Sequence, residues 1–200
     1  MKRILASILL VSVAATASAQ TLTAADRDKA MKYLASTKQA VLDATSGLSE
    51  AQWNYKSAPD RWSVAEVSEH IAAAEDLMRG MIENQVLKSP PPPEGEDVAA
   101  LDDLVLQAIP DRSHKAQAPE PLKPTNRFGS GDQAVKHFAE SRAKTESLLK
   151  DHDDLRAHAM DSPIGKKLDG YEWVLFIGAH SARHTKQILE VKADPGFPKK

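Results

Sequence analysis

Four helix starts constrain what this chain can fold into more than any other feature of its sequence. Each start pairs a polar residue with an acid or amide three residues later, which is the spacing of a helix N-terminal cap. The pairs are Thr23 with Asp26, Ser63 with Glu66, Ser130 with Gln133, and Asp169 with Glu172. Apolar residues follow each start at spacings of three and four, as in amphipathic helices. No segment alternates with a period of two, so the sequence predicts an all-α four-helix bundle without a sheet.

The connection between the second and third predicted helices is long and rich in proline. It runs from Ser89 to Gly129, and Pro90 to Pro93 prevent the second helix from continuing. A short helix is expected inside it, between Val98 and Ile109. A connection of this length can cross the bundle, so we expect the second and third helices to run parallel.

The first 19 residues have the pattern of a secretory signal peptide. Lys2 and Arg3 precede an apolar run from Ile4 to Ala15, and an A-x-A site ends at Ala19. The run is too short for a permanent membrane span, although an uncleaved anchor is the alternative. We therefore predict cleavage after Ala19, a single domain over residues 20–200, and a periplasmic or secreted location without a stable membrane span.

Composition excludes several functions and partners. The chain has no cysteine, so no thiolate of its own can act as a nucleophile or metal ligand. Its formal net charge is −2, and loss of Lys2 and Arg3 makes it −4. This balance argues against nucleic acid as a partner, because phosphate binding needs a basic face. A small molecule of unknown identity remains as ligand or substrate, and a homodimer remains open.

Three histidines form the sharpest candidate for a functional site. His180 and His184 lie four residues apart on the apolar stripe of the fourth predicted helix, so both imidazoles can reach one metal ion. His70 lies on the inward side of the second helix, at a matching height if these helices are antiparallel. Inward polar side chains are costly unless they share a partner. We predict a metal site at His70, His180 and His184; the alternative is histidines satisfied by hydrogen bonds in the core.

Two blocks of the sequence resemble the DinB-like superfamily. The first comprises LSEAQW at residues 48–53, APDRWSVAEV at 58–67 and then His70; the second comprises DGYEW at 169–173 and HSARHTKQ at 180–187. The resemblance covers the chain after the signal peptide. It implies an up-down-down-up bundle and a divalent metal held by His70, His180 and His184. It also implies relatives that are thiol S-transferases or metal-dependent hydrolases.

Other polar and aromatic residues carry weaker expectations. His137 is a reserve ligand, or a residue on the flank of the third helix, and Glu66 is assigned to the cap of the second helix. His114, His152 and His158 are expected in solvent, and Arg183 in a surface salt bridge. Trp62, Tyr171 and Trp173 are expected to be core or cap-packing residues.

The sequence leaves two functions open. The first is a metal-dependent hydrolase or transferase, because three histidines leave a coordination position for water or substrate. No general base can be assigned for it. The second is a non-catalytic metal-binding or small-molecule-binding protein of the cell envelope. Imidazole ligands suit zinc, nickel or iron, and ligand type alone does not choose among these divalent metals.

Overall fold

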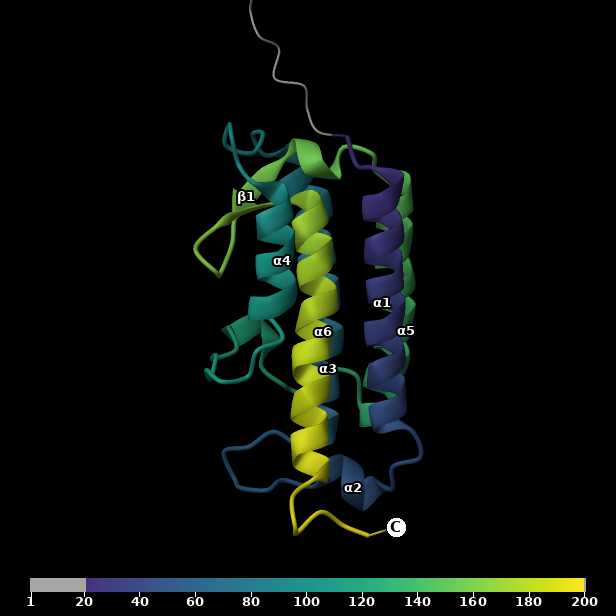
Figure 1. Cartoon of the computed structure of the whole chain (residues 1–200). Helices are drawn as coiled ribbons and strands as arrows, with labels where there is room; N and C mark the ends of the chain where they lie inside the picture. The colour runs from purple at the N-terminus through teal and green to yellow at the C-terminus, as the bar shows by residue number, and fades with distance from the viewer. Residues whose placement is uncertain (1–20, 200) are drawn as a thin grey trace, which may run out of the picture.

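Four long helices pack side by side along one axis (Figure 1). The computed structural model describes residues 21–199, so the predicted signal peptide lies outside the described residues. The long helices are α1 (Ala24–Thr45), α3 (Val64–Asn84), α5 (Gly131–Asp151) and α6 (Gly170–Lys192). The predicted helical bundle is therefore confirmed.

Each long helix begins where the sequence predicts. The side chains of Thr23, Ser63, Ser130 and Asp169 all accept a hydrogen bond from the backbone N–H three residues later. A fifth cap was not predicted from the sequence. Ser49 and Gln52 form a reciprocal capping box that starts a short helix, α2 (Glu50–Asn54). The same spacing rule, applied to Ser49, would have found it.

Shorter elements occupy the connections. The short helix expected between Val98 and Ile109 is confirmed as α4 (Val98–Ala108), which packs against α6. Single turns of 3-10 helix are η1 (Val86–Lys88), η2 (Glu120–Leu122) and η3 (Leu155–Ala157). No helix in residues 21–199 is long and apolar enough to cross a membrane.

The prediction of no sheet is wrong in one place. The strands β1 (Ala159–Asp161) and β2 (Lys167–Asp169) form an antiparallel hairpin directly before α6. Three residues per strand are too few for a period of two to be recognised in the sequence. The hairpin ends at Asp169, whose side chain also caps α6, so it sets where that helix begins.

A buried arginine gathers acidic residues near the start of α6. Arg156 donates from Nη1 to Asp102 at 3.0 Å and to Asp169 at 3.0 Å, and its Nη2 lies 3.3 Å from Asp26. Glu172 Oε1 is 3.9 Å from Arg156 Nη1 and has no hydrogen-bond partner among the described residues. Burial, followed by the charge of Asp169, raises the pKa of Glu172 to about 8.

This raised pKa predicts a specific dependence of stability on pH. In the folded chain Glu172 keeps its proton up to about pH 8, whereas in the unfolded chain it releases the proton near pH 4.5. The stabilisation of the folded state that results is complete below about pH 4.5 and is lost as the pH rises to about 8. The slope for one proton is at most about 1.4 kcal/mol per pH unit. Glu172→Gln keeps an oxygen that can accept the capping hydrogen bond but cannot titrate. The substitution should therefore flatten the dependence of the free energy of unfolding on pH in this range. Urea unfolding of both proteins between pH 5 and pH 8.5 measures the difference, and parallel profiles would contradict the prediction.

Candidate metal centre

The candidate site lies between α3 and α6 and is built from three imidazoles. His70 is seven residues beyond the Ser63 cap, in the second turn of α3. His180 and His184 are successive positions on one face of α6. His70 and His184 are buried, with 3% and 8% of their surfaces exposed, whereas His180 is half-buried. The structure thus brings together the three residues that the sequence singled out.

The inward nitrogens of the three rings are close enough to share one ion. His70 Nε2 lies 3.2 Å from His180 Nε2 and 3.2 Å from His184 Nε2. Three nitrogens bound tetrahedrally at about 2.1 Å from one zinc would be about 3.4 Å apart. Within residues 21–199, this is the one group of three or more His, Cys, Asp or Glu side chains with such spacing.

Outer hydrogen bonds determine which nitrogen of two rings carries the proton. His70 Nδ1–H donates to the Leu122 carbonyl at 2.9 Å, because a carbonyl can only accept. His184 Nδ1–H donates to Gln187 Oε1 at 2.8 Å. Arg112 Nη1, which can only donate, also contacts this Gln187 atom at 3.3 Å and identifies it as the oxygen. Both Nε2 atoms therefore direct lone pairs inward.

The electrostatic environment disfavours the protonated form of all three imidazoles. Burial is the largest cause: it lowers the pKa of His184 to about 3, places that of His180 well below its ordinary value, and lowers that of His70. Nearby positive charge acts in the same direction, from Arg127 on His70 and from Arg183 on His180. Neutral imidazole is the form that binds metal, and facing lone pairs favour a cation between them.

Comparison with known proteins places this chain in a family. A family model described as the DinB superfamily matches residues 33–188. The chain belongs to the DinB superfamily. A relative in Bacillus subtilis strain 168, the uncharacterized protein YuaE, is 28% identical over 149 residues, which are 73% of this chain and 86% of that protein.

A solved structure extends the comparison to the fold. YfiT from Bacillus subtilis is described as a probable metal-dependent hydrolase with an unusual four-helix bundle topology. It superposes with a TM-score of 0.59 and 13% sequence identity, over 88% of this chain and 91% of that chain. At this identity the likeness shows a shared fold.

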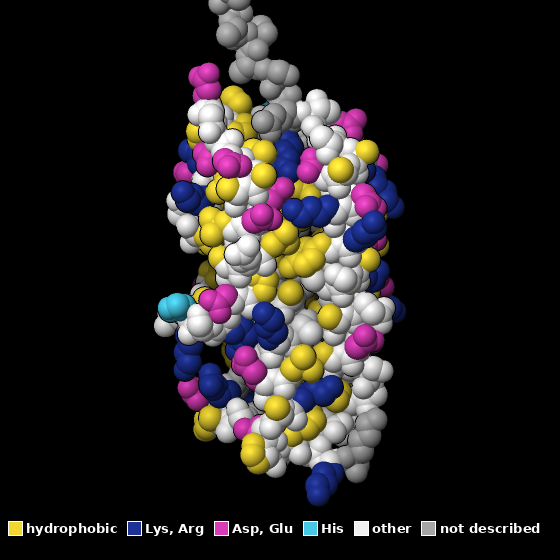
Figure 2. Space-filling view, viewed as in Figure 1, with side chains coloured by type: hydrophobic (Ala, Val, Ile, Leu, Met, Phe, Trp, Pro, Cys, Tyr) yellow, Lys and Arg dark blue, Asp and Glu magenta, His cyan; other side chains and the backbone are white. Residues whose placement is uncertain are grey.

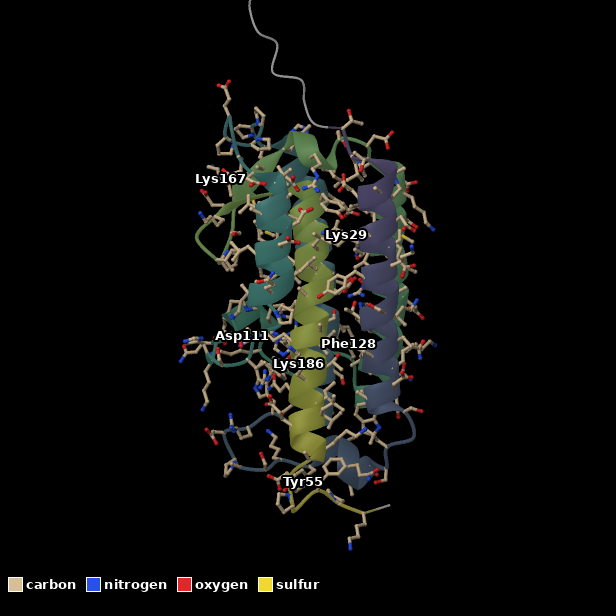
Figure 3. All side chains as sticks on the ribbon, in the orientation of Figure 1. Lys29, Tyr55, Asp111, Phe128, Lys167 and Lys186 are labelled. Carbon is tan, nitrogen blue, oxygen red and sulfur yellow. The ribbon has the colours of Figure 1, made fainter. Side chains whose placement is uncertain are left out.

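In this DinB superfamily member, the segment after α4 packs back onto α6 beside the histidines. Arg183 donates to the carbonyl oxygens of Asp111 and His114, and Lys186 donates to that of Pro110. Figure 3 shows Asp111 and Lys186 on this side of α6. Figure 2 shows a hollow on this side, bordered by Lys and Arg side chains. The predicted surface salt bridge of Arg183 is therefore wrong, because the returning chain offers it carbonyls instead.

The remaining histidines lie apart from the cluster. His137 Nε2 is 2.5 Å from Asp76 Oδ2 on the flank between α5 and α3, so it is not a reserve ligand. His114 is exposed, as predicted. His152 and His158 are half-buried rather than solvated, and His158 Nδ1 donates to the Ser89 carbonyl at 2.7 Å because the hairpin folds onto the end of η1.

The aromatic and acidic expectations have mixed outcomes. Glu66 accepts from the Ser63 N–H at 2.8 Å, which confirms its place in the cap. Tyr171 and Trp173 are buried in the core, as predicted. The Trp62 ring lies 4.9 Å from the His70 ring, so Trp62 covers the site as well as the helix start.

Two groups that orient the histidines were not predicted from the sequence. Gln187 is one helical turn after His184, and this i,i+3 spacing was an available signal. The Leu122 carbonyl had no signal, because it is a backbone atom 52 residues from His70 in the chain.

Proposed function

We propose that this protein binds a divalent metal ion through Nε2 of His70, His180 and His184 and acts as a metal-dependent hydrolase or transferase on a small molecule. The observation that carries the proposal is the convergence of three neutral imidazole nitrogens, two of them spaced 3.2 Å from the third. Imidazole donors fit zinc, nickel or iron. The description of YfiT as a probable metal-dependent hydrolase supports the same chemistry for this fold.

The chain supplies three ligands, and this number leaves a position for substrate or water. An ion held by these three ligands would act as a Lewis acid and would lower the pKa of a water bound at the open position. The protein's own groups hold the rings: Leu122 and Gln187 fix two imidazoles, and Trp62 limits solvent access from one side. Fixed rings lose little freedom when they bind, which favours affinity.

One observation favours a second function, that of a non-catalytic metal-binding protein. Among residues 21–199, the hydrogen bonds of the three imidazoles involve a backbone carbonyl, an amide and one another, and no carboxylate. A carboxylate near the metal would be the usual candidate for a general base. These contacts therefore assign no general base, and a protein that only binds metal does not need one.

Equilibrium dialysis followed by turnover assays separates these functions. The metal-free protein is dialysed against zinc, nickel or iron(II), and bound metal is counted against a His180→Ala variant. We expect one ion per chain in the wild type and close to none in the variant. The loaded protein is then assayed on ester, amide and thiol-transfer substrates. Metal-dependent turnover supports the enzyme, and stoichiometric binding without turnover on any class supports the binding protein.

We also infer that the four long helices follow an up-down-down-up order. The Leu22 N–H donates to the Asp153 carbonyl, which joins the start of α1 to the chain just after α5. The Tyr171 hydroxyl donates to the Asp26 carbonyl, which joins the starts of α6 and α1. The histidine contacts join an early turn of α3 to the later part of α6. These contacts support α1 and α6 running against α3 and α5.

Finally, we propose that the protein is exported. The proposal rests on the sequence pattern of residues 1–19 and on the small-residue site that ends at Ala19. Export predicts a mature periplasmic or secreted protein whose first residue is Gln20. Intact-mass measurement of protein taken from its native cell tests this directly, and an uncleaved chain in the cytoplasm would exclude it.

A further inference from the structure

A buried carboxylate next to His70 in the chain binds the connection between α3 and α5, residues 89–129, which is called the crossover segment below. Glu69 is 5% exposed, and it immediately precedes His70 on α3. Its carboxylate accepts the backbone N–H of Thr125 at 2.7 Å, that of Asn126 at 2.8 Å, and Arg127 Nε at 3.0 Å. One side chain of α3 therefore organises three successive residues of the crossover.

Arg127, which Glu69 holds, also binds the backbone beside the site. Its Nη1 donates to the Pro121 carbonyl at 3.0 Å, and its Nη2 donates to the Lys123 carbonyl at 2.7 Å. These carbonyls flank Leu122, whose own carbonyl accepts from His70 Nδ1. The guanidinium thus fixes the peptide units on both sides of the one that orients the imidazole.

Glu69 and Arg127 together form a clamp on this segment, and the backbone at Asn126 reflects it. Asn126 has φ +62°, in the left-handed region that residues with a side chain rarely adopt, although asparagine adopts it more readily than most. Its N–H is one of the groups that Glu69 accepts. A conformation that is locally unfavourable persists where surrounding contacts over-determine it.

We propose that Glu69 and Arg127 are positioning residues for His70. Together they hold the Leu122 carbonyl where it fixes the Nδ1–H tautomer of His70 and directs its Nε2 toward His180 and His184. The inference rests on the proposed metal-binding function for its role, although the tautomer itself is a property of the metal-free protein. Outer groups that orient a metal-binding histidine typically change metal affinity by 10-fold to 100-fold when they are removed.

Replacing Arg127 provides a test, because its charge and its positioning role predict opposite changes in zinc affinity. Its positive charge disfavours a cation at His70, and it is one cause of the lowered pKa of that imidazole. If charge alone mattered, Arg127→Met would tighten zinc binding. If Arg127 positions the Leu122 carbonyl, the same substitution should weaken zinc binding. The Arg127 side chain is 32% exposed, so its replacement is compatible with folding.

The experiment compares wild type, Arg127→Met, Glu69→Gln and a control, Arg79→Met. Arg79 is also on α3 and pairs with Asp76 and Glu83, far along the helix from His70. Nitrogen-15 NMR of the histidines reports the His70 tautomer without metal, and zinc titration with a competing chelator gives the dissociation constant. We expect Nδ1–H in wild type and control, mixed tautomers in the two clamp variants, and a dissociation constant 10-fold to 100-fold larger in those variants.

Two results would overturn the proposal: unchanged tautomer in both clamp variants, or tighter zinc binding in Arg127→Met. Failure of the proposed function is distinguishable from either. In that case wild type binds zinc no better than His180→Ala, whereas the tautomer still reports whether the clamp positions His70. Circular dichroism of each variant identifies any loss of fold, and a folded Arg127→Met protein is sufficient for the decision.

Discussion

Adding zinc to the metal-free protein is expected to raise its melting temperature by roughly 8–16 °C. Metal that binds the folded chain stabilises it by about 4.1 kcal/mol when its free concentration is about 1,000 times the dissociation constant. For a domain of this size, each kcal/mol shifts the melting temperature by roughly 2–4 °C. The shift arises because the three converged imidazoles exist as a site only in the folded protein. Differential scanning calorimetry with and without zinc measures it.

Two histidine variants show whether the shift belongs to this site. His180→Ala removes one of the three converging nitrogens, so its melting temperature should not respond to zinc or to a chelator. His114→Ala removes an exposed imidazole in the crossover and should keep the full response. A large zinc shift that survives in His180→Ala would place the stabilising ion elsewhere and would refute the assignment.

Breaking the ion pair at the centre of the bundle is expected to destabilise the fold by about 3–5 kcal/mol, because it leaves a buried charge unpaired. Arg142 and Glu75 have side chains that are 0% and 1% exposed. Arg142 Nε and Nη2 donate to the two Glu75 oxygens at 2.7 Å and 2.8 Å, and Nη1 donates to the Leu34 carbonyl at 2.8 Å. Glu75→Ala removes the carboxylate but leaves the guanidinium enclosed. Urea unfolding at neutral pH gives the change in the free energy of unfolding.

An exposed pair on α1 is the matched control. Lys32 Nζ lies 2.6 Å from Asp28 Oδ2, but both side chains are mostly in solvent. Lys32→Ala should change the free energy of unfolding by less than about 0.5 kcal/mol, since exposed i,i+4 pairs contribute little. The double variant Glu75→Leu, Arg142→Met should be less destabilised than Glu75→Ala, because no unpaired charge remains. Equal losses in all three variants would contradict this account.

The sequence by itself determined where the long helices begin and which histidines share a face. Capping depends on a side chain and a backbone N–H three residues apart, so Thr23, Ser63 and Asp169 could be recognised without any tertiary contact. The pairing of His180 with His184 depends only on helical geometry. Local interactions of this kind are complete within one segment, and they are encoded in a short stretch of residues.

Tertiary structure decided everything that depends on contacts between distant segments. Leu122 is 52 residues from His70, and its carbonyl has no side-chain identity for a sequence pattern to reveal. The partners of Arg142 and Arg156 lie on other elements, so their charges could not be paired in advance. The helices bring the three imidazoles to one height, and α6 itself supplies Gln187 to His184, but the crossover brings the Leu122 carbonyl that fixes the tautomer of His70. That carbonyl is positioned by packing around a crossover whose path is set by long-range contacts rather than by local propensity.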